Sequence, residues 1–296
     1  MIKHFPAFSK LSINHKDEIT RLTSAFAPYS DFNFTSLFCW DTDNTTEVSI
    51  LNNNLVIKMA DYISSEIIYS IIGNEEIDKS LDALLAIIPN LKLVPEIVVD
   101  SMKNRSSYVV SEDRDQFDYV YPLASQADLL GGHYKVKRNK ISKFMRTYEG
   151  KLSLKKIHFN DPAMKQEIHN IFLRWSDERK RSGEEVRRES ETLNKLFDYG
   201  KYFTLVGVLV YLDGVCIGFS INEILHMDYA ICHFQKSILT FDHSDVFLTN
   251  LVAKELKHFG CKYVNWEQDL GLPGLRELKQ SYFQEFFLKK YTVSKS

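Results

Sequence analysis

VNWEQDLGLPGLRELKQSYFQEFFLKKYTV, residues Val264 to Val293, places acids, bases and glycine around a turn between a predicted strand and a predicted helix. The strand is expected over Val264–Glu267 and the helix over 272–280, because Gly271 and Pro273 punctuate the chain between them. Turns from strand to helix expose functional groups in α/β proteins. This stretch is therefore a candidate site.

The charges of this stretch predict two features. Glu267 and Asp269 are expected on one face of the strand and its exit. Arg276 and Lys279 lie three residues apart on the helix, so they are expected to present two cations to one anionic group. A solvated carboxylate pair on a solvated helix face is the alternative at this point.

Composition places the chain among soluble globular proteins. It has 296 residues, 44% hydrophobic and 26% charged, with a formal net charge of −2. The length suits two domains, and any nucleic-acid contact has to come from a local basic patch.

The four cysteines are widely spaced without a CxxC pair, which predicts no metal centre and favours the cytoplasm. No stretch approaches the roughly 20 apolar residues of a membrane span, so no transmembrane segment is expected.

The second half gives the clearer order of elements. A strand at 151–159 precedes a helix that begins at Asp161–Pro162, a capping residue followed by proline in the first turn. That helix is expected to end near 181. The elements that follow are a helix at 186–199, strands at 204–211, 215–224 and 227–236, a helix at 244–259, the strand and helix described above, and a strand at 286–293. Asp213-Gly214 predicts a hairpin turn. This order resembles the GNAT acyltransferase fold, in which the fourth and fifth strands splay apart.

The first half runs in a similar order. Its expected elements are helices at 16–26, 34–40, 75–88 and 95–102, a hairpin of strands at 48–51 and 55–60 connected by Asn52-Asn53-Asn54, a strand at 67–72, a short strand between the last two helices, and a strand at 107–110. We therefore predict an α/β (α+β) protein of two tandem GNAT-like acyltransferase domains, with mixed central sheets flanked by helices. The predicted domains are 1–130 and 151–296, joined by a basic linker helix at 131–150. The duplication rests on element order, since no sequence repeat is evident.

The linker HYKVKRNKISKFMR, residues His133 to Arg146, is the densest basic cluster of the chain. On a helix, its apolar residues are expected on one side, namely Val136, Ile141, Phe144 and Met145. The other side then carries cations without an acid among them: Lys135, Lys137, Arg138, Lys140, Lys143 and Arg146. This surface is either a solvated helix face or a phosphate-binding surface for RNA, a nucleotide tail or an anionic head group.

Four segments, in order along nearly the whole chain, resemble a bacterial family related to the C-terminal domain of phosphatidylglycerol lysyltransferase. They are PYSDFNFTSLFCWD at 28–41, GGHYKVKRNKISKF at 131–144, HFQKS at 233–237 and NWEQDLGLPGLRELKQSY at 265–282. The resemblance implies tandem GNAT folds. The broader group includes transferases that move an amino acid from aminoacyl-tRNA to a lipid or a cell-wall peptide.

Two positions depart from the family pattern. Gln235 stands where the family usually has glutamate, so the position keeps hydrogen bonding but loses the charge. Trp266 stands where the family usually has arginine, which removes a bidentate anion grip. The matching positions are His233, Lys236, Glu267, Asp269, Gly271, Arg276, Lys279, Ser281 and Tyr282. Either change alters the substrate or marks a copy that binds without turnover.

The resemblance also suggests a donor and the roles of individual residues. The loop 237–243 (SILTFDH) lacks the glycine that lets backbone amides hold a CoA pyrophosphate, which favours aminoacyl-tRNA over acyl-CoA. Glu267 or Asp269 is expected to hold the α-ammonium group or to act as a base. His233 is either a catalytic base or a core histidine. The expected substrate-binding residues are Gln235, Lys236, Trp266, Arg276, Lys279 and Tyr282.

Three functions therefore stay open. The leading one is transfer of an aminoacyl group from aminoacyl-tRNA to a lipid head group, a peptide or a small amine, with the donor as co-substrate and no other cofactor. The second is an acyl-CoA-dependent GNAT N-acyltransferase, and the third is a non-catalytic binding protein of the same fold. The basic residues expected to bind phosphate or RNA are Lys135, Lys137, Arg138, Lys140 and Lys143.

Overall fold

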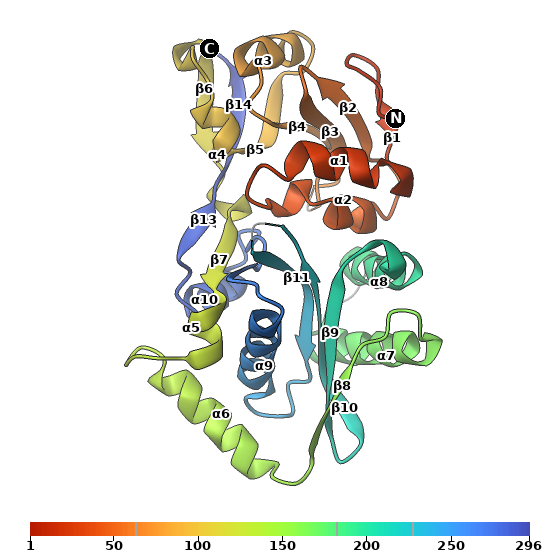
Figure 1. Cartoon of the computed structure of the whole chain (residues 1–296), viewed down its shortest axis with the longest axis vertical. Coiled ribbons are helices and arrows are strands. Elements are labelled where there is room, and N and C mark those ends of the chain that lie inside the picture. The colour runs from red at the N-terminus through yellow and green to blue at the C-terminus, as the bar shows by residue number, and fades with distance from the viewer. Residues whose placement is uncertain (63, 182, 227) are drawn as a thin grey trace. The chain divides into compact units, whose positions relative to one another are not determined.

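The computed structural model describes residues 1–62, 64–181, 183–226 and 228–296, so Met227 of the predicted strand lies outside the described residues. Backbone contacts divide the chain into two units (Figure 1). Unit 1 comprises Met1–Tyr119, Glu267–Ser281 and Phe286–Ser296, and unit 2 comprises Val120–Trp266 and Tyr282–Glu285. The predicted mixed α/β class is confirmed.

Unit 1 contains a four-stranded sheet in the order β1-β2-β3-β4 and a three-stranded sheet in the order β5-β14-β6. Its strands are β1 (Ser9–Lys10), β2 (Glu47–Leu51), β3 (Asn54–Ala60), β4 (Ile67–Ile72), β5 (Asn90–Pro95), β6 (Tyr108–Glu112), β13 (Phe286–Leu288) and β14 (Lys290–Lys295). Its helices are α1 (Lys16–Thr23), α2 (Phe34–Trp40), α3 (Ile77–Leu85), α4 (Glu96–Asp100) and α10 (Pro273–Gln280). Helix α3 packs its buried leucines Leu81 and Leu84 into an apolar core that Val293 of β14 joins.

The C-terminal segment corrects one expectation. The predicted single strand at 286–293 is two strands, β13 and β14, and β14 pairs with both β5 and β6 in unit 1. The units are therefore discontinuous in sequence, whereas the predicted domains 1–130 and 151–296 are continuous. The predicted duplication of a folding unit stays a prediction.

Unit 2 is built on a sheet whose strands run in the order β7, β12, β11, β10, β9 and β8. These strands are β7 (Asp118–Pro122, with Val120 to Pro122 in this unit), β8 (Leu152–Lys156), β9 (Leu205–Leu212), β10 (Val215–Ile224), β11 (Tyr229–Ser237) and β12 (Tyr263–Asn265). The helices are α5 (Leu123–Asp128), α6 (Lys135–Thr147), α7 (Pro162–Glu178), α8 (Glu184–Asp198) and α9 (Ser244–His258). The sequence prediction missed β7 and α5, which carry no alternating pattern or cap.

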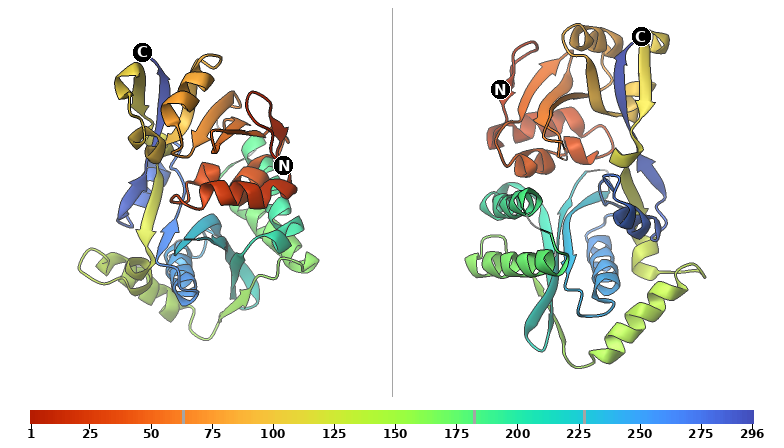
Figure 2. Two further views of the ribbon diagram at one scale, coloured as in Figure 1. Left: turned by 45° about the horizontal axis from the view of Figure 1, so that its top comes forward. Right: turned by 180° about the vertical axis from the view of Figure 1, so that it is seen from behind.

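The helices of unit 2 cover both faces of its sheet. The views of Figure 1 and Figure 2 show α9 on one face and α7 with α8 on the other. Helix α6 packs beside α9, where the rings of Phe144 and Phe247 stack with centroids 4.7 Å apart. This three-layer arrangement fixes which residues of β11 face α9.

Local sequence signals explain several boundaries. Asn52 and Asn53 adopt positive φ angles of 48° and 61° in the two-residue turn between β2 and β3, as the predicted hairpin requires. Asp213 and Gly214 do the same between β9 and β10. The Asp161 carboxylate caps α7 by accepting from the Ala163 amide at 2.8 Å. The predicted turn at Asp213-Gly214 and this cap are confirmed, whereas the predicted connection Asn52-Asn53-Asn54 is one residue shorter because Asn54 begins β3.

The helix phase predicted for the basic segment is partly wrong. Phe144 of α6 is buried and Ile141 is half-buried, but Val136 and Met145 are 63% and 45% exposed. Lys137 is half-buried in their place. The helix therefore turns one cation inward and leaves two apolar side chains in solvent.

Candidate functional site

The candidate site in unit 2 begins where β11 and β12 part. The two strands pair in parallel from Tyr229 with Tyr263 to Ile231 with Asn265, and the register ends there. Strand β11 continues to Ser237 with β10 as its partner on the other side. The second half of β11 therefore has no strand on its β12 side within the described residues. The predicted splay of two strands at this point stays a prediction.

Thr249 of α9 is the centre of a hydrogen-bond network at this position. Its hydroxyl donates to the Asp245 carbonyl at 2.9 Å, so its oxygen is left as an acceptor. The Gln235 side-chain amide donates to that oxygen at 2.7 Å, and Thr249 also lies close enough to the Tyr282 hydroxyl to oppose the effect of burial on its pKa. The network connects β11, α9 and the segment after α10. A glutamate at 235 cannot donate to Thr249, which gives the family departure a physical consequence.

Aromatic rings surround Tyr282. The Trp266 ring contacts the Tyr282 ring at a centroid distance of 5.0 Å and the Tyr121 ring at 4.6 Å. The Tyr134 hydroxyl donates to the Tyr282 carbonyl at 3.0 Å. Burial raises the pKa of Tyr282, so its hydroxyl stays protonated at neutral pH. Trp266 therefore takes part in this cluster through its ring contacts with Tyr121 and Tyr282.

Lys137 joins the basic helix to this cluster. Its ammonium group lies 3.6 Å from the centroid of the Tyr282 ring, a cation–π contact. Burial, with a smaller contribution from the nearby Lys140, lowers the pKa of Lys137 to about 8, and Asp245 opposes the shift. A substantial part of Lys137 is therefore neutral at slightly alkaline pH.

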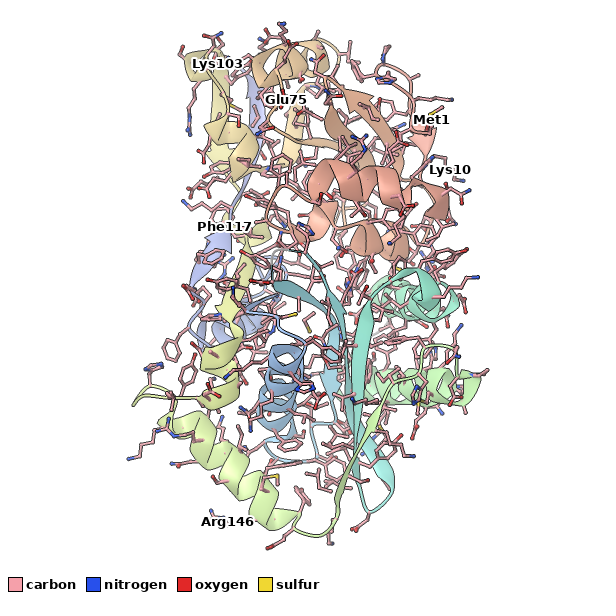
Figure 3. The ribbon with its side chains drawn as sticks, viewed as in Figure 1. Met1, Lys10, Glu75, Lys103, Phe117 and Arg146 are labelled. Atoms are coloured by element: carbon pink, nitrogen blue, oxygen red, sulfur yellow. The ribbon has the colours of Figure 1, made fainter. Side chains whose placement is uncertain are left out.

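The other cations of α6 lie on its exposed face. Arg138 donates to the carbonyls of Leu129 and Gly131, which ties the start of α6 to the preceding loop. Figure 3 labels Arg146 near the end of the helix that is far from α5. Within the described part of the chain, no ion pair is formed by the remaining exposed cations, Lys135, Lys140, Lys143 and Arg146. The predicted cationic surface is thus present, with Lys137 turned away from it.

His233 lies at an irregularity of β11, because the pairing with β10 passes from Ile221 with Phe234 to Asn222 with Cys232 and leaves His233 without an opposite residue. Its Nε2 atom lies 3.1 Å from the Glu223 carboxylate on β10, and both side chains are buried. This pair fits the core-histidine alternative, and a catalytic role for His233 stays a prediction. Glu223 carried no signal in the sequence because its partner lies on another strand.

Lys236 points to the opposite face of the sheet. Its ammonium group pairs with Glu189 of α8 at 2.6 Å and lies 3.9 Å from the centroid of the Trp175 ring. Burial lowers the pKa of Lys236, and Glu189 opposes that shift. The structure therefore separates Lys236 from Gln235, with which the sequence grouped it.

The acidic and basic residues of the opening segment form a cluster of their own in unit 1. Asp269 is fully buried, and its two oxygens accept five hydrogen bonds. Their donors are the Gly271 amide at 2.9 Å, Arg276 at 2.8 and 2.7 Å, the Tyr119 hydroxyl at 2.6 Å and Arg114 at 3.3 Å. Burial alone raises the pKa of Asp269, but the hydrogen bonds from Arg276, Tyr119 and Gly271 outweigh it and lower the pKa to about 2. Such a carboxylate is a poor base.

The predicted pair of substrate-binding cations is also used internally. Arg276 grips Asp269 with two nitrogens and reaches Asp115 at 2.6 Å. Lys279 donates to the carbonyl of Glu267 at 3.0 Å and to that of Gln268. The two cations therefore hold the turn and do not converge on one anion.

Glu267 and Asp269 do not share a strand face. Strand β12 ends at Asn265, and Glu267 has a positive φ of 58°. A left-handed residue breaks the alternation on which that expectation rested. A role for Glu267 as base or ammonium ligand stays a prediction.

A second buried charge cluster lies in unit 1. Lys290 is fully buried and donates to Asp118 at 2.7 Å and to the Ser30 hydroxyl at 3.1 Å, and it also pairs with Asp31. Ser30 and Asp31 belong to the PYSDF segment that carries the family resemblance. Two of the four resembling segments therefore build internal charge clusters.

Comparison with known proteins agrees with the sequence resemblance. The family model described as "Phosphatidylglycerol lysyltransferase, C-terminal" matches residues 24–294. The chain belongs to this family. A search of curated proteins found no match.

Solved structures share the fold along the whole chain. A conserved protein of unknown function from Bacteroides thetaiotaomicron is 23% identical with a TM-score of 0.84, and all of both chains is covered. The C-terminal domain of a putative lysylphosphatidylglycerol synthetase from Agrobacterium fabrum is 12% identical with a TM-score of 0.66, covering 96% of this chain and 92% of that one. L-PGS from Bacillus licheniformis is 10% identical with a TM-score of 0.63, covering 100% and 94%. Within the described residues, no helix is long and apolar enough to cross a bilayer.

Proposed function

We propose that the protein is an acyltransferase that moves an aminoacyl group from aminoacyl-tRNA to an acceptor hydroxyl or amine on a lipid head group, a peptide or a small molecule. In this proposal unit 2 is a GNAT-like domain, and the chain is a tandem of two such domains. Family membership supports the reaction class. The observation that carries the choice of donor is the inward turn of Lys137 onto Tyr282 from a helix whose other cations face solvent.

The cations of α6 suit a polyanionic donor. Lys135, Lys140 and Lys143 are exposed on a helix without an acidic residue, so they repel one another until an anion binds. Phosphates along the acceptor end of tRNA supply such anions, and binding releases their counterions. Lys137 then meets the terminal ribose beside the aromatic cluster.

The network around Thr249 suits an aminoacyl ester. The side-chain amide nitrogen of Gln235 donates a hydrogen bond to Thr249. The side-chain carbonyl oxygen of Gln235 is therefore assigned to accept a hydrogen bond from the α-ammonium group of the aminoacyl moiety. Backbone amides of the second half of β11 are assigned to the oxyanion that forms when the acceptor attacks the ester carbonyl. The bond from the acceptor oxygen or nitrogen to the carbonyl carbon forms, the ester bond breaks, and the tRNA hydroxyl leaves with a proton. Neutral Lys137 is the nearby base for the acceptor proton.

Acyl-CoA is the less favoured donor for a local reason. The segment before α9, residues 237–243, has no glycine, His243 adopts a positive φ of 70° at the helix start, and Asp242 and Asp245 flank that start. Two carboxylates oppose a pyrophosphate at a helix N-terminus. The experiment is a stability assay with CoA thioesters, in which millimolar ligand is expected to leave the melting temperature unchanged.

The proposal is tested with tRNA charged with each amino acid in turn, incubated with the protein and with vesicles containing phosphatidylglycerol or with amine acceptors. Loss of the ester together with a labelled acceptor product is the expected result. Absence of both tRNA binding and ester loss for every amino acid contradicts it. The double variant Lys140→Gln/Lys143→Gln is expected to bind tRNA more weakly, while Lys254→Gln, on the exposed side of α9, serves as the matched control.

A further inference from the structure

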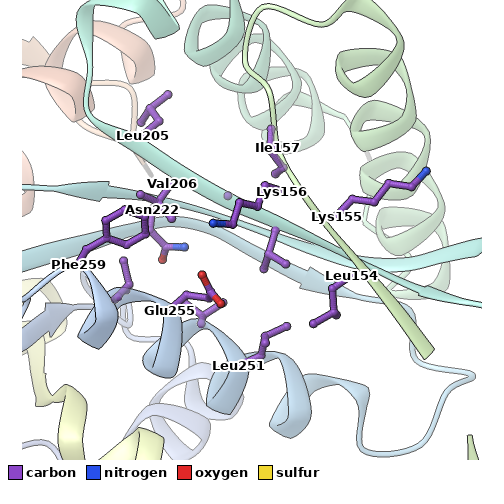
Figure 4. Close-up of a pocket in the computed structure, with 14 residues that line it drawn as sticks. Leu154, Lys155, Lys156, Ile157, Leu205, Val206, Asn222, Leu251, Glu255 and Phe259 are labelled. Atoms are coloured by element: carbon purple, nitrogen blue, oxygen red, sulfur yellow. The ribbon is translucent and has the colours of Figure 1, made fainter. Parts of the chain in front are cut away.

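Unit 2 contains a cavity of about 260 Å³ between strands β8 and β9 and the second half of α9 (Figure 4). Its walls are mostly apolar and include Leu205, Val208, Leu251 and Leu256. The volume lies just below the span of roughly 300–1,000 Å³ that is usual for drug-sized ligands. The cavity therefore suits one compact molecule.

Asn222 of β10 places an unmatched acceptor in this cavity. The Ser220 hydroxyl donates to the Phe234 carbonyl at 3.0 Å, so the Ser220 oxygen accepts from the Asn222 amide nitrogen at 2.9 Å. This fixes the orientation of the amide and turns its Oδ1 atom away from Ser220. Asn222 is 2% exposed, and its Oδ1 atom has no hydrogen-bond partner among the described residues. A buried acceptor without a donor is unfavourable, and a ligand that donates to it removes that penalty.

Two charges of opposite sign complete the lining. Glu255 comes from α9 and Lys156 from β8, and Figure 4 shows the Glu255 carboxylate and the Asn222 amide facing the cavity. Neither Glu255 nor Lys156 has an ion pair within the described parts of the chain. The cavity thus offers an anion and a neutral acceptor for an ammonium group, a cation for a carboxylate, and apolar walls for a side chain.

We infer that this cavity is a binding site for a free apolar α-amino acid of about the size of leucine. Its ammonium group donates to Asn222 Oδ1 and to Glu255, its carboxylate pairs with Lys156, and its side chain packs on the leucines of β9 and α9. The site is made of residues other than Gln235, Thr249, Tyr282 and Lys137. It involves no bond making, and it stands whether or not the proposed transfer reaction is correct.

The test is calorimetric titration of the full chain with four probes that each remove one feature. L-Leucine carries all three groups, 3-methylbutylamine lacks the carboxylate, 4-methylpentanoate lacks the ammonium group, and glycine lacks the side chain. Leucine is expected to bind, and each of the other probes is expected to bind at least about tenfold more weakly, as loss of one charged hydrogen bond or of the buried side chain implies. No binding of leucine up to its solubility limit, or equal binding of leucine and glycine, overturns the inference.

Two variants locate the site. Glu255→Gln keeps the shape of a half-buried side chain that has no ion pair to lose among the described residues, and it is expected to weaken leucine binding about tenfold. Lys254→Gln, the neighbouring exposed position outside the cavity, is the control and is expected to leave binding unchanged. Unchanged binding in Glu255→Gln, with leucine still bound, places leucine elsewhere and also overturns the inference.

Discussion

The polar cluster around Asp269 in unit 1 and the polar cluster around Thr249 in unit 2 differ in how their charges are matched. Asp269 is an anion enclosed by two arginines, a tyrosine hydroxyl and a backbone amide. The Thr249 cluster is assembled from neutral groups and has one half-buried lysine, Lys137, with a lowered pKa. A matched buried anion stabilises a turn, whereas a cation kept in a poorly solvated place is typical of a functional position.

The largest expected effect on stability comes from removing the buried negative charge of Asp269. Asp269→Asn removes the anion but leaves Arg276 and Arg114 beside a buried amide, so the free energy of unfolding is expected to fall by roughly 3 kcal/mol. Asp115→Asn is the matched control, because Asp115 binds the same arginine with a side chain that is 55% exposed. Asp115→Asn is expected to lower the free energy of unfolding by less than about 1 kcal/mol.

Urea denaturation measures both values. Equal losses in Asp269→Asn and Asp115→Asn contradict the view that the buried anion organises unit 1.

Acid pH sharpens the same comparison. The folded-state pKa of Asp269 is lowered to about 2 from an ordinary 3.8, so its stabilising contribution is present above 3.8 and is lost as the pH falls through 2. The stability difference between the wild type and Asp269→Asn is therefore expected to be constant from about pH 7 to pH 5 and to shrink below about pH 4. Thermal unfolding at a series of pH values checks it, and a difference that grows on acidification contradicts it.

The pKa of Lys137 makes the stability depend on pH in the alkaline range. Its pKa falls from 10.5 in the unfolded chain to about 8 in the folded protein, so the unfolded state binds more protons between these values and stability rises with pH there. Lys137→Met removes this contribution. The variant is expected to be more stable than the wild type at about pH 7 and to lose that advantage by about pH 10. A variant that is less stable at neutral pH contradicts the inferred cost of burying this ammonium group.

The smallest expected effect on stability concerns the exposed face of α6. Lys140→Gln/Lys143→Gln is expected to change the free energy of unfolding by less than about 0.5 kcal/mol, because neither side chain is buried. The same variant is expected to lower the salt dependence of tRNA binding by about 0.7–0.9 in the log–log slope for each phosphate that is no longer neutralised. Filter binding across salt concentrations measures the slope, and an unchanged slope contradicts a phosphate-binding role.

The sequence predicted the elements better than the site. Turn pairs such as Asn52-Asn53 and the Asp161-Pro162 cap act locally, so their residues suffice to place a boundary. The assignment of Glu267 and Asp269 to one face failed because a single left-handed residue after β12 ended the alternation.

The remaining site residues were not predicted because their partners are distant in sequence. Thr249 lies inside an apolar helix, and nothing near it in sequence indicates that Gln235 donates to it or that Tyr282 lies beside it. The charges of Arg276 and Lys279 suggested a ligand because their internal partners come from the turn before the helix and from Asp115. A dense charged motif therefore identified the family, whereas the candidate site is built largely from neutral residues.

A comparison of Tyr282→Phe with Asp269→Asn in the transfer assay, at a temperature where both variants are folded, decides which of the two clusters carries the reaction. Tyr282→Phe removes the hydroxyl that lies beside Thr249 and is expected to slow loss of the aminoacyl ester at least about tenfold, because the ester is then held less well. Folded Asp269→Asn is expected to keep the wild-type rate. The reverse result, with Tyr282→Phe fully active and folded Asp269→Asn inactive, would place the reaction in the Asp269 cluster and contradict the assignment of the site to unit 2.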